Sequence, residues 1–447
     1  MIIKKLKEAA NYVSMHKKSV GRVGFAVLAQ GLIGLMSVLT SFVLPARIGP
    51  EEYGYYQEFF FYLSYLNVLG IGVNDGIALN YAGMECSEEK KRKIRSALFI
   101  QIGYIIIATI VFCGIALLQG SLEKKFIVIL LSANILPTII ICVESGIFLA
   151  ENKSYIYNLA AVLQKTIFCL LLVLLLVNKI HYYRWIILSQ TLTNYLIAIV
   201  FFFWAKDYYI GRLGQFQEGF KELGMLSSTG IMVALSVAVS GLIPSFGRII
   251  VEHFCSISEY GIYSFYISLL SIVLSFTSAV GIVVFPIIRN TKSELVKNDY
   301  QLFDKYLSIA GLGIYLLYPI LYLFIKYFLK DYYDGIGYLG FLLPICYPIA
   351  KIQILMTPYY KMYRKEKQLL AVNAVSLVIT VALNSVAYLV FRNTMAIAMT
   401  SLVSCDFYYA LMRRYLPREV KKQNSVWELA VQAVFVGGIV VGGFFYK

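Results

Sequence analysis

Residues 23–44 read VGFAVLAQGLIGLMSVLTSFVL, a run without a charged side chain. A helix rises about 1.5 Å per residue, so a run of this length crosses a hydrocarbon layer roughly 30 Å thick. Several lysines precede the run, and no small-residue cleavage site follows it. It is therefore predicted to be an uncleaved membrane span and not a signal peptide.

The rest of the chain repeats this pattern of apolar blocks. Of its 447 residues, 59% are hydrophobic and 15% are charged, and the mean hydropathy is +0.72, a balance that soluble domains do not reach. Lipid leaves only helices for such blocks. Further spans are predicted at 55–82, 97–118, 126–149, 159–177, 185–205, 226–251, 262–288, 306–329, 336–356, 369–391 and 394–416. We expect an all-α polytopic membrane protein with about twelve transmembrane helices.

The basic tail at 417–447 contains one more apolar stretch, at 427–446. Glu428 and four glycines weaken this stretch as a span. It is predicted to be either a thirteenth membrane helix or an interfacial helix.

Basic residues alternate between the loops. One set of loops holds clusters within 90–95, 153, 206–221, 289–305, 361–367 and 413–422, whereas the opposite loops hold one or two basic residues each. The positive-inside rule therefore predicts a multi-pass protein of the cell membrane with a cytoplasmic amino terminus. The net charge of +15 follows from this topology, and no long basic face is present that would predict a nucleic-acid partner. The seven cysteines are scattered, with no CxxC pair, so no metal site is expected.

The predicted connections are short. None exceeds about twenty residues, which leaves no room for a folded soluble domain on either side of the membrane. Function must therefore lie within the spans. This weighs against a membrane enzyme such as a glycosyltransferase or a polysaccharide polymerase, and no paired catalytic residues at one membrane face are found.

One motif occurs twice at the same topological place. EYGYY at 52–56 recurs as EYGIY at 259–263, each time after an outward-running span that ends near an arginine. Either copy alone is explained by an acidic helix start and by tyrosines that suit the membrane interface. Two copies six spans apart predict two six-helix lobes, at 1–210 and 211–416, related by an axis along the membrane normal.

The two motifs extend into longer segments that carry a family resemblance. The segments are RIGPEEYGYY at 47–56, LGIG at 69–72, FKEL at 220–223 and SEYGIYS at 258–264. With the span count, they resemble the Wzx-type polysaccharide flippases, whose superfamily also holds the MATE drug exporters and the lipid II flippase MurJ. One departure is Gly247-Arg248, where the family often has an Asp-Arg pair.

The resemblance implies a cargo and partners. The cargo is an oligosaccharide on a polyprenyl diphosphate, which is flipped from the cytoplasmic to the outer leaflet for surface polysaccharide biosynthesis. Implied partners are this lipid-linked oligosaccharide, membrane lipids and other proteins of polysaccharide assembly. No cofactor is expected apart from Na⁺ or H⁺ as a coupling ion.

Cationic residues inside the spans are the first candidates for the site, because charge at bilayer depth is expensive and normally faces a cavity or a partner. Lys165 and Lys351 each lie about two turns from the nearest basic loop, although each stem is long enough to snorkel. Arg47 and Arg248 end the first and seventh spans, where a guanidinium can hold a diphosphate. Both are also typical anchors, and Arg248 has Glu252 four residues on as a candidate ion-pair partner. These two lysines and two arginines are the predicted substrate-binding residues.

Acidic residues inside the spans are the next candidates. Glu144 and Asp406 are predicted to be counter-ions or ion-coupling groups. For Asp75, close to the interface, a solvated or helix-capping role is favoured. Gln30 and Asn194 are predicted to be interhelical hydrogen-bond partners.

A MATE-like exporter of organic cations is the nearest alternative function. It predicts a cavity dominated by carboxylates, whereas Lys165 and Lys351 suit an anionic cargo. Pro244, Pro344 and Pro348 are predicted to bend or interrupt spans, as gating helices often require.

Overall fold

The computed structural model describes residues 17–83, 87–290, 296–416, 432 and 434–437, and this part of the chain contains helices and no strands. The longer helices are α2 (Lys17–Leu63), α4 (Glu88–Leu117), α5 (Leu122–Ala150), α6 (Ser154–Val177), α7 (Tyr183–Trp204), α8 (Phe216–Ser245), α10 (Ile257–Asn290), α11 (Val296–Phe328), α15 (Glu366–Phe391) and α16 (Thr394–Arg414). Shorter α-helices are α3 (Val73–Asn80), α9 (Gly247–Phe254), α12 (Ile336–Leu342), α13 (Cys346–Lys351) and α14 (Thr357–Met362). Short 3-10 segments are η1 (Leu66–Gly70), η2 (Lys206–Tyr208), η3 (Lys330–Gly335) and η4 (Leu343–Ile345), and η5 (Ile352–Met356) is a π-helical turn. The all-α prediction is confirmed.

The predicted spans correspond to the helices. Among the described residues, 11 helical segments are long and apolar enough to cross a membrane. One of them contains both of the first two predicted spans, because α2 bends at Gly49, whose φ is 73°. Only glycine adopts such a backbone readily. Counted as two arms, α2 brings the number of crossings to the predicted twelve.

Two predicted spans are less regular than their hydropathy indicates. The second is broken after η1, where Ile71 and Gly72 have φ values of 47° and 72°, and continues as α3. The tenth is a chain of short turns from α12 to η5 that contains Pro344 and Pro348. Proline removes a helical hydrogen bond, so the predicted interruption at these prolines is confirmed.

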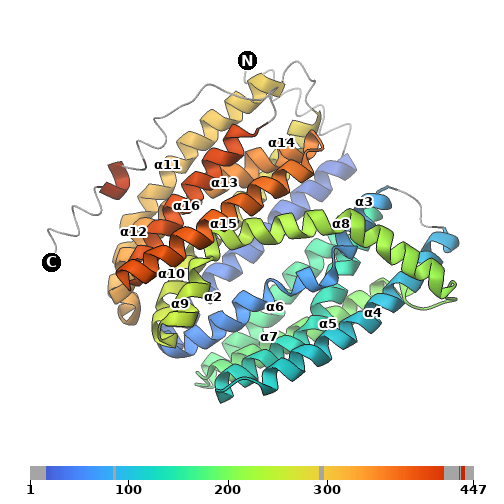
Figure 1. Cartoon of the computed structure of the whole chain (residues 1–447), viewed down its shortest axis with the longest axis horizontal. Helices are drawn as coiled ribbons and strands as arrows, with labels where there is room; N and C mark the ends of the chain where they lie inside the picture. Colours follow the sequence, from blue (N-terminus) through green and yellow to red (C-terminus); the bar gives the residue numbers. More distant parts are fainter. Residues whose placement is uncertain (1–16, 84–86, 291–295, 417–431, 433, 438–447) are drawn as a thin grey trace.

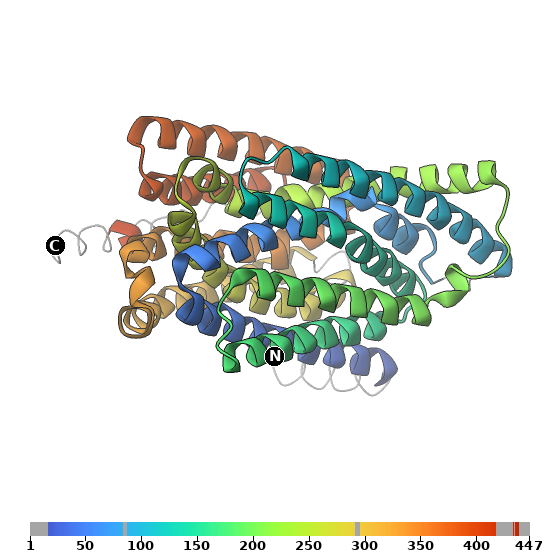
Figure 2. The same cartoon turned by 90° about the horizontal axis from the view of Figure 1, so that it is seen from below.

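The helices form two bundles that meet at one end and diverge at the other (Figure 1). We call the meeting point the junction end; it holds the bend at Gly49, α9 and η3. The opposite, basic end holds the start of α4, the η2–α8 segment and the α14–α15 turn. Figure 2 shows the helices of both bundles running along the long axis of the molecule. The predicted lobe boundary at 210/211 falls between η2 and α8.

Helix α8 belongs to the second half of the chain but packs on both bundles. It contacts α3 and α4 near the basic end and α15 further along, as its course in Figure 1 shows. A Cβ on Gly230 of α8 would overlap the backbone at Gly72 and Gly76. Glycines on both sides therefore let α8 and the start of α3 touch backbone to backbone.

The two copies of the repeated motif pack against each other at the junction end. A Cβ on Gly54 would overlap the carbonyl oxygen of Ile257, and one on Gly261 would overlap that of Pro50. Helices α2 and α10 consequently make an extensive contact. The motif tyrosines Tyr53 and Tyr260 are buried in this contact, and their level in the membrane stays a prediction.

Candidate functional site

A cavity of about 430 Å³ lies inside the amino-terminal bundle, between both arms of α2 and helices α5, α6 and α7. Among the described residues, no aspartate or glutamate lines it, and Lys165 is the only charged residue in its lining. Its amide lining comes from Gln30, Asn67, Gln164, Gln190 and Asn194. The space is therefore polar and cationic inside an otherwise apolar bundle.

Three of the cavity amides, Gln164, Gln190 and Asn194, belong to one hydrogen-bond network. Asn194 Oδ1 accepts from Gln164 Nε2 at 2.8 Å and from Gln190 Nε2 at 2.9 Å. Asn194 Nδ2 donates to Asn134 Oδ1 at 2.8 Å, and Asn134 Nδ2 donates to Thr191 Oγ1 at 2.8 Å. The network links α5, α6 and α7, which confirms the interhelical role predicted for Asn194. Such a network fixes the side chains, so the polar wall is preorganised.

Lys165 enters this cavity from α6, next to Gln164. Its Nζ lies 5.8 Å from the ring centroid of Phe168. Within the described part of the chain, no carboxylate forms an ion pair with it. Lys165 is half-buried, and a cation inside a membrane bundle without a counter-ion is costly, a cost that a bound anion would lower. Its role as a substrate ligand stays a prediction.

Lys351 lies in the other bundle and in a different environment. Its side chain is 1% exposed, and its Nζ donates to Asp304 Oδ1 and to Ser308 Oγ, each at 2.8 Å. The rings of Tyr347 and Tyr409 lie within 5.3 and 5.9 Å of the same atom. The alternative that Lys351 snorkels to the headgroups is therefore wrong. The structure does not bring Lys351 to the cavity that holds Lys165.

The two predicted arginines lie at the junction end. Arg248, on α9, is buried; its Nη2 donates to the carbonyl oxygen of Ser264 at 3.3 Å, and its guanidinium lies 5.9 Å from the centroid of Phe61. It forms no ion pair with Glu252 among the described residues, so that alternative is wrong. Arg47 is exposed beside the bend of α2. Neither arginine lines the cavity.

The acidic candidates lie away from the cavity lining. Glu144, on α5, is 0% exposed, and the hydroxyl of Tyr209 is near its carboxyl group. Asp406, on α16, accepts two hydrogen bonds from Gln432 Nε2, at 3.0 and 3.1 Å. Asp75 lies in the first turn of α3, a position that suits a carboxylate at a helix start.

The stretch at 427–446 lies largely outside the described residues. Of the part that is described, Gln432 contacts α16 through Asp406, and Phe435 packs on α11 with its ring centroid 4.4 Å from that of Tyr315. These contacts place Gln432 and Phe435 against the carboxy-terminal bundle. Whether it spans the membrane stays a prediction.

Comparison with known proteins identifies the family. Residues 20–292 match the sequence profile of the polysaccharide biosynthesis proteins, which is more than half of the chain. The chain belongs to this family. No curated protein matches this polysaccharide biosynthesis protein in sequence.

Solved structures show the fold of this polysaccharide biosynthesis protein. An inward-facing multidrug resistance MATE transporter of the MOP superfamily aligns with a TM-score of 0.68 at 13% identity, over 92% of this chain and 98% of that one. The lipid II flippase MurJ, in an inward closed conformation, aligns with a TM-score of 0.58 at 13% identity, over 96% and 99%. A MOP superfamily transporter from Pyrococcus furiosus aligns with a TM-score of 0.57 at 15% identity, over 89% and 95%. The chain is thus a multi-pass membrane protein with the MOP transporter fold.

Sequence reasoning missed three residues of this polysaccharide biosynthesis protein that lie beside the candidate site residues. They are Asp304 next to Lys351, Gln164 next to Lys165, and Gln432 next to Asp406. Asp304 precedes the predicted span at 306–329, but α11 begins earlier, at Val296, so Asp304 lies within the helix. Asp304 and Ser308, four residues apart on one helix face, were the available signal. For Gln164, the available signal was its position next to Lys165 in the sequence.

Proposed function

We propose that this protein flips a polyprenyl-diphosphate-linked oligosaccharide from the cytoplasmic to the outer leaflet, by alternating access between its two bundles and without covalent chemistry. The observation that carries the proposal is Lys165, a cation without an ionic partner among the described residues, in a cavity walled by amides. An ammonium group attracts a diphosphate, and amides exchange hydrogen bonds with sugar hydroxyls. The family, polysaccharide biosynthesis proteins, supports a glycan cargo.

The size of the cavity suits part of such a cargo. At about 430 Å³ it lies within the range of roughly 300–1,000 Å³ that small-molecule sites occupy. It is large enough for a polar headgroup but not for a polyprenyl chain. In this proposal the lipid tail stays in the bilayer while the headgroup enters the bundle.

The arrangement of the bundles suits loading from the cytoplasm. They diverge at the basic end, which the positive-inside rule assigns to the cytoplasmic side (Figure 1). The inward-facing MATE structure also has a higher TM-score, 0.68, than the outward-facing one, 0.60. We propose that the cargo enters in this arrangement and leaves when the junction end opens, with H⁺ or Na⁺ as the coupling ion.

The MATE-like alternative is weaker on the same observation. An exporter of organic cations needs carboxylates to receive its cargo, and none lines the cavity. The Pyrococcus furiosus transporter shows that the polarity of this fold's pocket varies, since a reverse polarity of its binding pocket suggests a different function. Likeness to MATE structures therefore agrees with an anionic cargo.

Deletion of the gene tests the proposal directly. Lipid-linked oligosaccharide should accumulate on the cytoplasmic leaflet while its synthesis continues, because a carrier moves its cargo without making it. A lectin or glycosidase added to intact spheroplasts should then find little glycan, and the wild-type gene should restore it. An unmodified or shortened glycan on the outer face at normal abundance would instead indicate a membrane enzyme.

A further inference from the structure

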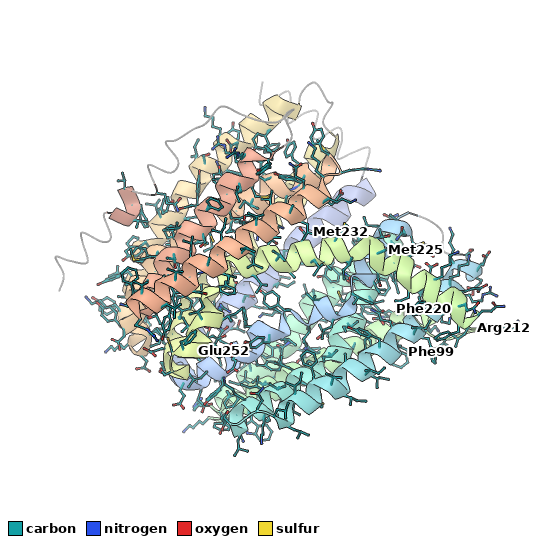
Figure 3. The ribbon with its side chains drawn as sticks, in the orientation of Figure 1. Phe99, Arg212, Phe220, Met225, Met232 and Glu252 are labelled. Atoms are coloured by element: carbon teal, nitrogen blue, oxygen red, sulfur yellow. The ribbon has the colours of Figure 1, made fainter. Side chains whose placement is uncertain are left out.

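A short hydrogen bond joins the two bundles at the junction end. The hydroxyl of Tyr62, on the second arm of α2, donates to Glu252 Oε2 on α9 at 2.5 Å. The two residues are 190 positions apart in the sequence and belong to different lobes. Figure 3 shows Glu252 at the junction end, far from Arg212 at the basic end. Opening of the junction end has to break this bond.

A second carboxylate, that of Glu58, lies near this hydrogen bond at the junction end. Glu58 lies four residues before Tyr62, so both project from one face of α2. Its side chain is 4% exposed, and its Oε2 has no hydrogen-bond partner among the described residues. Because Tyr62 hydrogen-bonds to Glu252, the side chain of Glu58, one turn earlier on the same helix face, lies in the neighbourhood of Glu252. The junction end therefore brings together one carboxylate from each lobe.

Among the described residues, few positive charges lie near the carboxylates of Glu58 and Glu252 to offset their negative charge. Lys124, exposed at the start of α5, acts on both carboxylates, and His253 acts on Glu252. Neither forms an ion pair with them within the described residues. Arg248 is directed to the carbonyl oxygen of Ser264. The hydroxyl of Tyr260, on α10, is buried and lies near both carboxylates and near Ser264.

We propose that Glu58 and Glu252 form a proton-binding site that keeps the junction end closed while it holds a proton. Two neighbouring carboxylates in a poorly solvated place repel each other when both are ionised, and one proton removes that repulsion. Release of the proton leaves two negative charges on opposite lobes, which separates the second arm of α2 from α9. Proton binding is thereby coupled to the choice between the two arrangements of the bundles.

A proton suits this site better than a metal cation. Two carboxylates and a hydroxyl can also hold Na⁺. The Tyr62 hydroxyl, however, donates a hydrogen bond to Glu252, so its hydrogen atom and not its oxygen lone pairs points into the site. The proposal rests on the alternating access in the proposed function, and it needs no particular cargo.

The test measures the separation of the bundles against pH. Spin labels are attached to genetically encoded residues at positions 212 and 367. Double electron–electron resonance between them measures the separation of the two bundles at the basic end. The full-length protein is placed in lipid nanodiscs without cargo. As the pH rises from mildly acidic to mildly alkaline, the distance distribution should shift from a long to a short peak, because the junction end opens as the basic end closes.

Matched variants assign the shift to this site. Glu58→Gln and Glu252→Gln each remove one charge and should abolish the shift, leaving the long peak at every pH. Glu51→Gln, which removes an exposed carboxylate from the same arm of α2, should shift as the wild type does. Tyr62→Phe keeps both carboxylates but weakens the closed junction, so its shift should occur at lower pH; this variant remains informative if a glutamine variant fails to fold.

Three results would overturn the proposal. They are a wild-type distance that does not respond to pH, glutamine variants with the full wild-type response, and a distance that follows Na⁺ at constant pH instead. Because no cargo is present, a negative result here leaves the flippase function standing, and a failed cargo assay leaves this site standing.

Discussion

Lys351 Nζ and Asp304 Oδ1 are 2.8 Å apart in the interior of the carboxy-terminal bundle, where both side chains are almost completely buried. Such a pair contributes little stability in sum, but breaking it leaves a buried charge uncompensated. The two intramembrane lysines of this protein therefore differ: Lys351 has a carboxylate partner, and Lys165 has none among the described residues.

Lys351→Met should destabilise the protein by about 3–5 kcal/mol, because Asp304 then lacks its counter-charge. The double variant Lys351→Met with Asp304→Asn removes both charges and should recover most of this loss. Thermal unfolding of the purified proteins in detergent, arranged as a double-mutant cycle, measures the coupling. If the stability lost in the double variant equals the sum of the losses in the two single variants, Lys351 and Asp304 do not interact directly.

Gly261→Ala should weaken the contact between the two repeated motifs. The added Cβ would overlap the backbone carbonyl of Pro50, which cannot rotate away, and overpacking of this kind costs typically about 1–3 kcal/mol. Gly224→Ala, on α8, is the matched control, because a Cβ there meets nothing within 4 Å. It should leave the unfolding temperature unchanged or raise it slightly. An equal effect of both substitutions would mean that the close approach of α2 and α10 is dispensable.

The sequence predicted the course of the chain through the membrane, because hydropathy over a whole span depends on local composition alone. It also predicted the weak points of the tenth span, since Pro344 and Pro348 break helices for a local reason. It did not predict the break at Ile71 and Gly72. That break accompanies the close backbone contact with Gly230 on α8, which depends on tertiary packing.

The candidate site was predicted only in part for the same reason. Lys165 was found because a charge inside a span is conspicuous by itself. The amides around it are individually ordinary, and their network depends on three helices meeting. Asp304 is 47 residues from Lys351 in the sequence, so its pairing was invisible before the fold was known. The repeated motif predicted two lobes, but only the fold shows that the two copies pack on each other and bury Tyr53 and Tyr260.

The orientation of the protein is testable by labelling. In a variant whose seven native cysteines are replaced by serine, Glu51→Cys at the junction end should react with a membrane-impermeant maleimide added to intact cells, and Glu89→Cys at the basic end should not. The expectation follows from the basic clusters, which are retained on the cytoplasmic side. Both sites should react once the membrane is permeabilised. Labelling of Glu89→Cys alone in intact cells would reverse the orientation and with it the direction of transport.

Lys165 provides the most direct prediction for transport. Lys165→Ala removes the only charge of the cavity and should lower the rate of flipping by roughly ten- to a hundredfold, since a hydrogen bond to a charged group contributes about 1.5–3 kcal/mol and about 1.4 kcal/mol is tenfold. Its stability should not fall, because no ion pair within the described residues is lost. Lys165→Arg keeps the charge and should retain more transport than Lys165→Ala.

Lys305→Ala, which removes an exposed lysine of α11, is the control for this substitution and should transport as the wild type does. Flipping is measured as the appearance of glycan on the outer face of cells that carry each variant in place of the deleted gene, at matched protein levels. If Lys165→Ala restores surface glycan as fast as the wild type, the cavity does not hold the charged part of the cargo. An alanine variant that fails only through loss of folded protein would likewise remove Lys165 from the site, and the melting temperature of the purified variant separates that case from a true loss of binding.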